Sequence, residues 1–184
     1  MMSLKSNFEL MAAYNQRINS SIYNAAATLS SDELKRDRGA FFSSIIGTLN
    51  HIIVGDTIWL KRFANHPASF PSLDYIRALD TPLSLDAIIY PQFSALTAAR
   101  NKMDDVIVQL TSELSDDDVA CTLEYSNTKG LVFRKNFGAL LQHLFNHQTH
   151  HRGQVSTLLF QAGIDIGATD LLMNIADVES PSQA

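Results

Sequence analysis

Residues 137–161, FGALLQHLFNHQTHHRGQVSTLLFQ, form the stretch that decides the fold. No proline interrupts it, and Gly163 stands just after it, where a glycine often ends a helix. Four of the six histidines of the chain lie in this stretch: His143, His147, His150 and His151. Because a helix turns by about 100° per residue, these imidazoles and Gln154 share an arc of roughly 100°. The stretch therefore predicts a long helix with one face rich in imidazole groups.

Three more long helices are predicted upstream. Apolar residues recur at intervals of mostly three and four residues over about residues 4–29, 40–65 and 85–114. Residues 30–38 separate the first two helices as a break followed by a charged connector. The second helix ends before Pro67, because a residue before a proline avoids the helical region. A connection that contains proline and serine then covers residues 67–82.

A small β-hairpin is predicted between the third and fourth long helices. Residues 120–125 and 131–135 are β-prone, and residues 126–130 between them have the composition of a turn. The acidic run at residues 115–118 lacks the glycine and the later glutamate of a calcium loop, so we interpret it as a solvated turn. Pro91 lies early in the third helix, which therefore either begins there or kinks.

Four amphipathic helices with one hairpin insertion indicate an all-α fold, a four-helix bundle. We expect a single domain over residues 1–178, with a short helical piece at about residues 170–176. Residues 179–184 are expected to be a frayed tail.

Composition excludes several classes of function. The chain has 184 residues, of which 46% are apolar and 18% charged, as in a folded domain. Its net charge of -5 without a basic patch argues against nucleic acid as a partner. No apolar run is long enough for a membrane span, and the N-terminus lacks a signal-peptide core. The one cysteine, Cys121, forbids an intrachain disulfide. We therefore expect a cytoplasmic protein without a membrane partner.

A metal site is the chemistry that the histidines favour. His147 and His151 lie one turn apart on the same face of a helix, a geometry that suits two ligands on one ion. His51, in the middle of the second helix, is the best candidate for a third ligand. Gly47 and Gly55 flank it one turn away on either side, and each costs roughly 1 kcal/mol relative to alanine in a helix. This cost is justified if the space above and below the imidazole must stay open.

Three neutral imidazoles with a vacant position describe a catalytic type of site rather than a closed structural one. Such a set suits zinc, nickel, copper or iron(II), and we favour zinc or nickel. Gln154 could orient a bound water or substrate, and Gly153 is expected to leave space beside His151. The pair His143 and His147 remains an alternative set of ligands. Each histidine taken alone is also compatible with a surface position or a hydrogen-bonded core position.

The sequence resembles the DinB/YfiT-like family. The second helix carries a histidine, an acidic residue and a tryptophan at His51, Asp56 and Trp59, and residues 147–154 read HxxxHRGQ. Tyr14-Asn15 and the ending at residues 162–171 also look like the family, so the resemblance covers nearly the whole chain. It implies an up-down-down-up bundle, often dimeric, that holds a divalent metal on three histidines. Carried over by position, those ligands are His51, His147 and His151.

The resemblance also implies two classes of function. The first is a metal-dependent transferase or hydrolase that activates a low-molecular-weight thiol or a water, with Gln154 and Arg152 positioning the substrate. The second is a non-catalytic, metal-binding, dimeric stress-response protein in which the metal clamps two helices together. An open coordination position facing a cleft would favour the enzyme, whereas a fourth ligand such as His143 or His150 would favour the clamp. A homodimer is expected because the second and third helices carry more apolar positions than one buried stripe needs.

Overall fold

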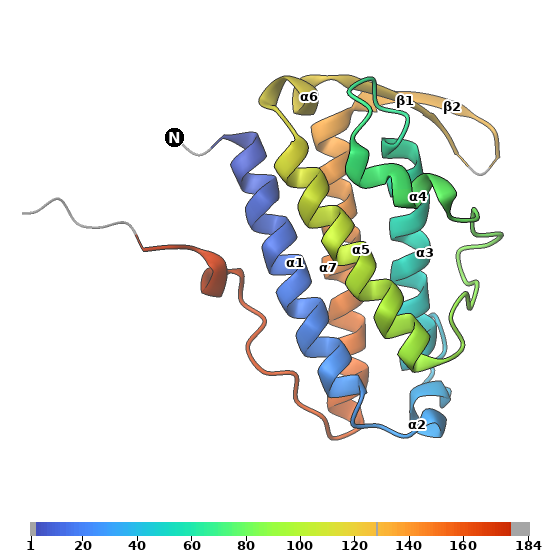
Figure 1. The fold of residues 1–184 in the computed structure, drawn as a ribbon. Helices are drawn as coiled ribbons and strands as arrows, with labels where there is room; N and C mark the ends of the chain where they lie inside the picture. The colour runs from blue at the N-terminus through green and yellow to red at the C-terminus, as the bar shows by residue number, and fades with distance from the viewer. Residues whose placement is uncertain (1–2, 128, 178–184) are drawn as a thin grey trace, which may run out of the picture.

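The computed structural model describes residues 3–127 and 129–177. Four long helices make up most of it: α1 (Leu4–Ala26), α3 (Ile45–Phe63), α5 (Phe93–Glu113) and α7 (Phe137–Gln161). Helix α1 packs against α5 and α7, and α3 packs against the same two helices, so the four form a closed square. Figure 1 shows α1 and α7 running in one direction and α3 and α5 in the other. The predicted all-α, up-down-down-up bundle is therefore confirmed.

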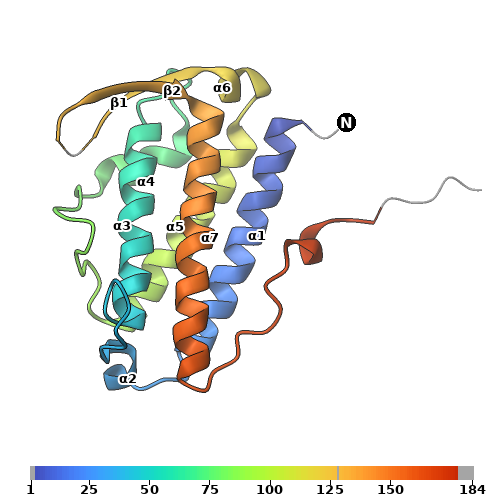
Figure 2. The same ribbon diagram turned by 180° about the vertical axis from the view of Figure 1, so that it is seen from behind.

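A long connection makes α3 and α5 parallel. After α3 the chain forms the short helices η1 (Pro71–Leu73) and α4 (Asp74–Ala78) at one end of the bundle. Residues 79–92 then return along the outer side of α3 to the other end (Figures 1 and 2). The side chain of Asn50 holds this connection, because it accepts from the Tyr90 N–H at 2.8 Å and donates to the Tyr90 carbonyl at 3.1 Å. The outer face of α3 is thereby covered by the chain itself, which accounts for part of its excess of apolar positions.

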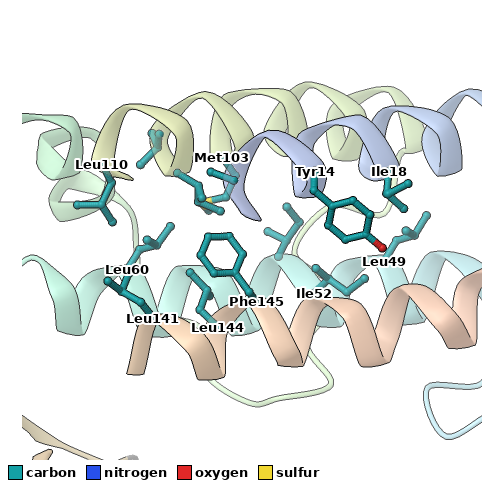
Figure 3. Close-up of a cluster of buried hydrophobic side chains, with 14 of the residues drawn as sticks. Tyr14, Ile18, Leu49, Ile52, Leu60, Met103, Leu110, Leu141, Leu144 and Phe145 are labelled. Carbon is teal, nitrogen blue, oxygen red and sulfur yellow. The ribbon is translucent and has the colours of Figure 1, made fainter. Parts of the chain in front are cut away.

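The apolar core lies between the four long helices. Figure 3 shows Phe145 of α7 at its centre, with Met103 of α5 and Ile52 of α3 facing it. Each long helix contributes side chains that are almost fully buried. The helical stripes predicted from apolar spacing are those that meet here, because burial of one continuous stripe on each helix is what stabilises a bundle.

Helix α7 has the bounds that its sequence predicts. At its start, the Asn136 side chain accepts a hydrogen bond from the Ala139 N–H. At its end, Gly163 adopts φ +82°, and the Ile164 and Gly163 N–H groups donate to the carbonyls of Leu159 and Phe160. This pair of bonds satisfies carbonyls of the last helical turn, and it requires the left-handed conformation that glycine adopts readily.

Helices α3 and α5 begin later than predicted. Helix α3 starts at Ile45 rather than near residue 40, because residues 40–44 form a tight turn in which Ser43 has φ +62°. Helix α5 starts at Phe93 rather than near residue 85, two residues after Pro91, so the proline does not kink it. Residues 85–92 instead belong to the connection on α3, and this tertiary placement outweighs their local pattern.

Two short helices occur where a break and a turn were predicted. Helix α2 (Ser31–Lys35) begins with the Ser30 side chain accepting from the Glu33 N–H. Helix α6 (Asp116–Ala120) begins with a reciprocal cap between Ser115 and Asp118. Serine followed by acidic residues is typical of both turns and helix starts, so the acidic run after α5 stabilises a helix N-terminus instead of a loop.

The predicted hairpin is confirmed. Strands β1 (Thr122–Ser126) and β2 (Val132–Asn136) pair antiparallel with Tyr125 opposite Phe133. The hairpin lies with α6 across one end of the bundle (Figure 2). The last predicted helical piece appears as the 3-10 helix η2 (Leu171–Asn174), and residues 179–184 lie outside the described residues.

Candidate metal centre

Three histidines, one from α3 and two from α7, meet between these two helices. The Nε2 atom of His51 lies 3.1 Å from Nε2 of His147 and 3.1 Å from Nε2 of His151. One nitrogen from each ring lies within 4.8 Å of the other two. Tetrahedral coordination with bonds of about 2.0–2.1 Å places ligand nitrogens about 3.3 Å apart. The three side chains that the sequence singled out could therefore hold one metal ion.

Hydrogen bonds on the far side of two rings aim their Nε2 atoms at this common point. His51 Nδ1 lies 2.7 Å from the carbonyl oxygen of Leu85, and His151 Nδ1 lies 2.8 Å from Oε1 of Gln154. Because both partners are acceptors, each Nδ1 carries the proton and each Nε2 keeps its lone pair. Partners of this kind are typical of metal-ligating histidines. Gln154 thus positions the candidate ligand His151, a role that differs from the orientation of a bound water or substrate that its spacing suggested.

The electrostatics keep the imidazoles neutral. Burial lowers the pKa of His51 and of His151 below the ordinary value for histidine. For His147, burial together with the neighbouring His151 and His51 lowers the pKa to about 3. A neutral imidazole is the form that binds a metal, so little proton competition is expected at neutral pH. The donor set fits a transition metal that accepts nitrogen ligands.

The glycines of α3 make room, although only one does so beside a ligand of the cluster. A Cβ atom on Gly55 would lie 2.5 Å from Cε1 of His147, so the absence of a side chain lets that ring rest on α3. A Cβ on Gly47 would collide with the carbonyl oxygen of Phe42, so this glycine admits the preceding turn rather than empty space. No atom lies within 4 Å of a Cβ position on Gly153, so the space there is open, as predicted, but it does not depend on the glycine.

Replacing Gly55 by alanine should therefore displace His147 and weaken metal binding. The imidazole is the obstacle, and it can move only away from α3 and thus away from the position it shares with His51. We expect at least a tenfold loss of metal affinity, in the range seen when parts that support ligands are altered. Isothermal titration with zinc measures the affinity. Gly153→Ala is the matched control: it adds a methyl group to open space and should leave affinity unchanged while raising the helix propensity.

The other histidines of α7 lie outside the cluster. The ring of His143 packs edge-on against Trp59, with centroids 4.8 Å apart, and its centroid is 6.2 Å from that of His147. His150 is exposed, and its Nε2 lies 3.3 Å from Nε2 of Gln154. Among the described residues, no fourth histidine, cysteine or carboxylate joins the three. The alternative pair of His143 and His147 is therefore not the one that the fold brings to His51.

The cluster opens onto a cavity of about 640 Å³. Its wall is largely apolar around the imidazoles, with Phe41, Phe42 and Leu85 as the main apolar side chains. The ring of Phe42 stacks on that of His51, with centroids 3.8 Å apart and planes 17° apart. A coordination position that faces this cavity is accessible to a small molecule, whereas bulk water meets mainly apolar side chains.

Arg152 does not line this cavity. The sequence suggested that it positions a substrate, but its side chain points into the bundle and is 4% exposed. There its Nη1 donates to the side-chain oxygens of Asn15 and Gln148, and its Nη2 donates to the Thr149 hydroxyl at 3.1 Å. Residues 151 and 152 are successive on a helix, so their side chains leave about 100° apart, and here His151 lines the cavity while Arg152 is buried inside the bundle.

Arg152 belongs to a buried polar network that sequence reasoning missed. Asp56 of α3 pairs with Arg100 of α5 and accepts from Gln148 of α7 at 2.7 Å. Arg100 also lies 2.9 Å from Asp104, which accepts from Asn19 of α1 at 2.8 Å. The network holds two arginines and two aspartates, so its formal charge is zero, and it joins all four long helices. One signal was present: Arg100 and Asp104 interrupt the apolar stripe of their helix.

The comparisons with known proteins agree with this architecture. A model of the DinB family matches residues 2–180. The chain belongs to the DinB family. The resemblance drawn from His51, Asp56, Trp59 and the HxxxHRGQ run is thus confirmed.

A curated member of the DinB family is also similar to the chain. It is the protein named DinB of Bacillus subtilis (strain 168), which is 24% identical over 162 residues. The alignment covers 85% of this chain and 87% of that protein. No solved structure was found to match the chain. Within the part of this DinB-family chain that the structure describes, no helix has both the length and the apolar character needed to cross a membrane.

Proposed function

We propose that the protein is a metal-dependent enzyme in which His51, His147 and His151 hold one divalent transition metal. The observation that carries the proposal is the open face of the cluster. Three imidazoles converge, and the fourth side borders a cavity of about 640 Å³ instead of a further protein ligand among the described residues. Catalytic sites of this kind keep one position for water or substrate, whereas structural sites are closed by four protein ligands.

The reaction that this site suits is activation of a nucleophile. A divalent ion bound here would lower the pKa of a thiol or a water so that it reacts at neutral pH. The thiol or water loses its proton to solvent, its sulfur or oxygen forms a bond to an electrophilic carbon, and the displaced group leaves with the bonding electrons. Leu85 and Gln154 hold two of the ligands in orientation. Phe41 and Phe42 present apolar side chains to the cavity. We favour zinc or nickel, with iron as an alternative, and a low-molecular-weight thiol as the nucleophile.

A non-catalytic role is the alternative. The ligands come from α3 and α7, so a bound ion would also clamp these two helices together. In that case the metal should raise the melting temperature without supporting turnover. We further propose that the protein acts as a homodimer, which light scattering at micromolar concentration would test.

The test is a screen of the metal-loaded protein. Purified protein is loaded with zinc, nickel or iron(II) and assayed with several small thiols, and with water alone, against a panel of electrophilic acceptors. Turnover should require the metal and disappear in His151→Ala. Stoichiometric metal binding that raises the melting temperature, with no turnover for any thiol or for water, would instead support the clamp.

The metal-free protein should lose stability as the pH falls below about 6.5. Folding lowers the pKa of His147 to about 3, whereas an unfolded chain titrates near 6.5. Between these values the unfolded state binds a proton that the folded state does not, so stability rises with pH across this window. Urea unfolding after chelation, at several values between about pH 4.5 and 7.5, measures the slope. His147→Gln should flatten it, and an identical slope in the variant would contradict the assignment.

A further inference from the structure

A tight turn before α3 holds two phenylalanines in opposite environments. The Ser43 N–H donates to the Ala40 carbonyl at 2.8 Å, and the Arg38 N–H donates to the Ser43 carbonyl at 2.7 Å. Within this turn Phe42 points inward and stacks on His51, while Phe41 points outward and is 88% exposed. The two rings meet edge to face, with centroids 4.8 Å apart. The turn therefore carries an exposed aromatic ring to the immediate edge of the metal centre.

The backbone of this turn is constrained to keep that arrangement. Ser43 has φ +62°, a left-handed conformation that residues other than glycine seldom adopt. Gly47 admits the Phe42 carbonyl at a place where any side chain would collide with it. Strained conformations of this kind persist only where the surrounding structure enforces them, and they cluster at functional sites. The strained turn therefore indicates that the exposed ring of Phe41 has a functional role.

Phe41 stands where three hollows of the surface meet. One is the cavity of the metal centre, a second of about 630 Å³ lies beside the start of α3, and a third of about 400 Å³ lies over α7. Among the described residues, Phe41 is the one side chain that lines all three. A molecule that extends from the metal centre into either neighbouring hollow therefore has this ring within its reach.

Charge around the three hollows is sparse. Asp86 is the one acidic or basic side chain, histidines aside, among the described residues that line the metal cavity. Lys35 joins it in the hollow beside α3, and the hollow over α7 has neither acidic nor basic side chains among those that the structure describes. Apart from a metal ion bound at the cluster, the wall thus offers a carboxylate, sulfonate or phosphate no arginine and only one lysine, in the neighbouring hollow, while Asp86 repels each of them. Apolar contact is what this surface provides.

We propose that Phe41 is a specificity-determining residue that binds the acceptor substrate, and that this acceptor is uncharged and carries an aromatic or similarly flat apolar group. The inference deepens the proposed function, on which it rests, by naming the class of the electrophile. The flat group packs against the exposed ring of Phe41, in an offset or edge-to-face contact. Its reactive end then lies toward His151, on the cavity side of the cluster.

Binding of a matched pair of fluorescent probes tests this proposal without any turnover. Phenylnaphthylamine is neutral, and anilinonaphthalenesulfonate has the same ring skeleton with one added sulfonate. The protein as purified should bind the neutral probe about tenfold more tightly than the anionic one, and Phe41→Ala should weaken the neutral probe about tenfold. The affinity of Phe41→Leu for the neutral probe should lie between that of the parent protein and that of Phe41→Ala. Asp86→Asn should tighten binding of the anionic probe. Because Phe41 is exposed, these variants should keep the melting temperature of the parent protein.

Phe160→Ala is the matched control, since Phe160 is 74% exposed on α7 and lines none of the three hollows. Equal effects of Phe41→Ala and Phe160→Ala, or equal affinity for both probes, would overturn the proposal. So would a change of oligomeric state in Phe41→Ala by light scattering, because it would show that a second copy covers the ring. Titration of the same protein with zinc separates the two proposals: failure to bind the metal, with an intact and Phe41-dependent preference for the neutral probe, would contradict the proposed function and not the acceptor class.

Discussion

Replacing His51 by alanine should reduce the metal content of the protein from one ion per chain to nearly none. The same result is expected for His147→Ala and His151→Ala, because the Nε2 atoms of these two residues each lie 3.1 Å from Nε2 of His51. Loss of a ligand should cost more than the roughly 10–100-fold that loss of a supporting residue costs in metal affinity. Elemental analysis after dialysis, together with titration of the metal-free protein, measures both content and affinity.

His143→Ala is the matched control for these variants. It removes an imidazole from the same helix, one turn from His147, but its ring packs on Trp59 outside the cluster. We expect it to retain one metal ion per chain. Full metal content in His51→Ala combined with its loss in His143→Ala would show that the assignment of ligands is wrong. Circular dichroism should be nearly unchanged in all four variants, since the apolar core between the helices is untouched.

Replacing Arg100 by methionine should destabilise the fold by about 3–5 kcal/mol. Arg100 is 1% exposed and is the cation that lies between the carboxylates of Asp56 and Asp104. Methionine fills much of the volume but leaves both carboxylates buried without that cation, which is the costly way to break a buried ion pair. Urea unfolding of the metal-free variant, compared with the parent protein at the same pH, measures the loss.

The pH dependence of this loss is a second readout. Burial raises the pKa of Asp56 and of Asp104, and Arg100 acts in the opposite direction on both. Without the arginine these pKa values should rise further, so the folded variant takes up protons at a higher pH than the unfolded chain does. Its deficit relative to the parent should therefore shrink as the pH is lowered from neutral. A deficit that is independent of pH would point to lost packing instead of unpaired carboxylates.

An exposed ion pair supplies the control for the buried one. Arg134 and Glu124 lie across the hairpin with 3.8 Å between their charged atoms, and their side chains are 74% and 65% exposed. Arg134→Met should change the free energy of unfolding by less than about 1 kcal/mol, as is usual for exposed pairs. A similar loss in both variants would mean that burial of the network has little energetic consequence.

Local sequence determined the parts of this protein whose physics is local. The bounds of helix α7 were predicted correctly from signals that act over a few residues. These are an apolar stripe with helical spacing, the absence of proline, and a glycine just after the last turn. His147 and His151 were paired by helical spacing alone. The hairpin followed from β-prone runs around a turn. The mid-helix position of His51 and its flanking glycines made it the candidate for the third ligand.

Tertiary structure alone decided the rest. The turn at residues 40–44 and the connection over α3 shorten two predicted helices, because contacts with distant residues outweigh local propensity there. In the sequence, Arg152 cannot be told from a surface arginine, and the position of Arg100 on an apolar stripe is only a weak signal. The packing of four helices shows that both side chains are buried against carboxylates and amides. Helical spacing could place two imidazoles on one face, but the meeting of His51 with them depends on how α3 lies against α7. That relation is set by contacts between residues about a hundred positions apart, which no local pattern encodes.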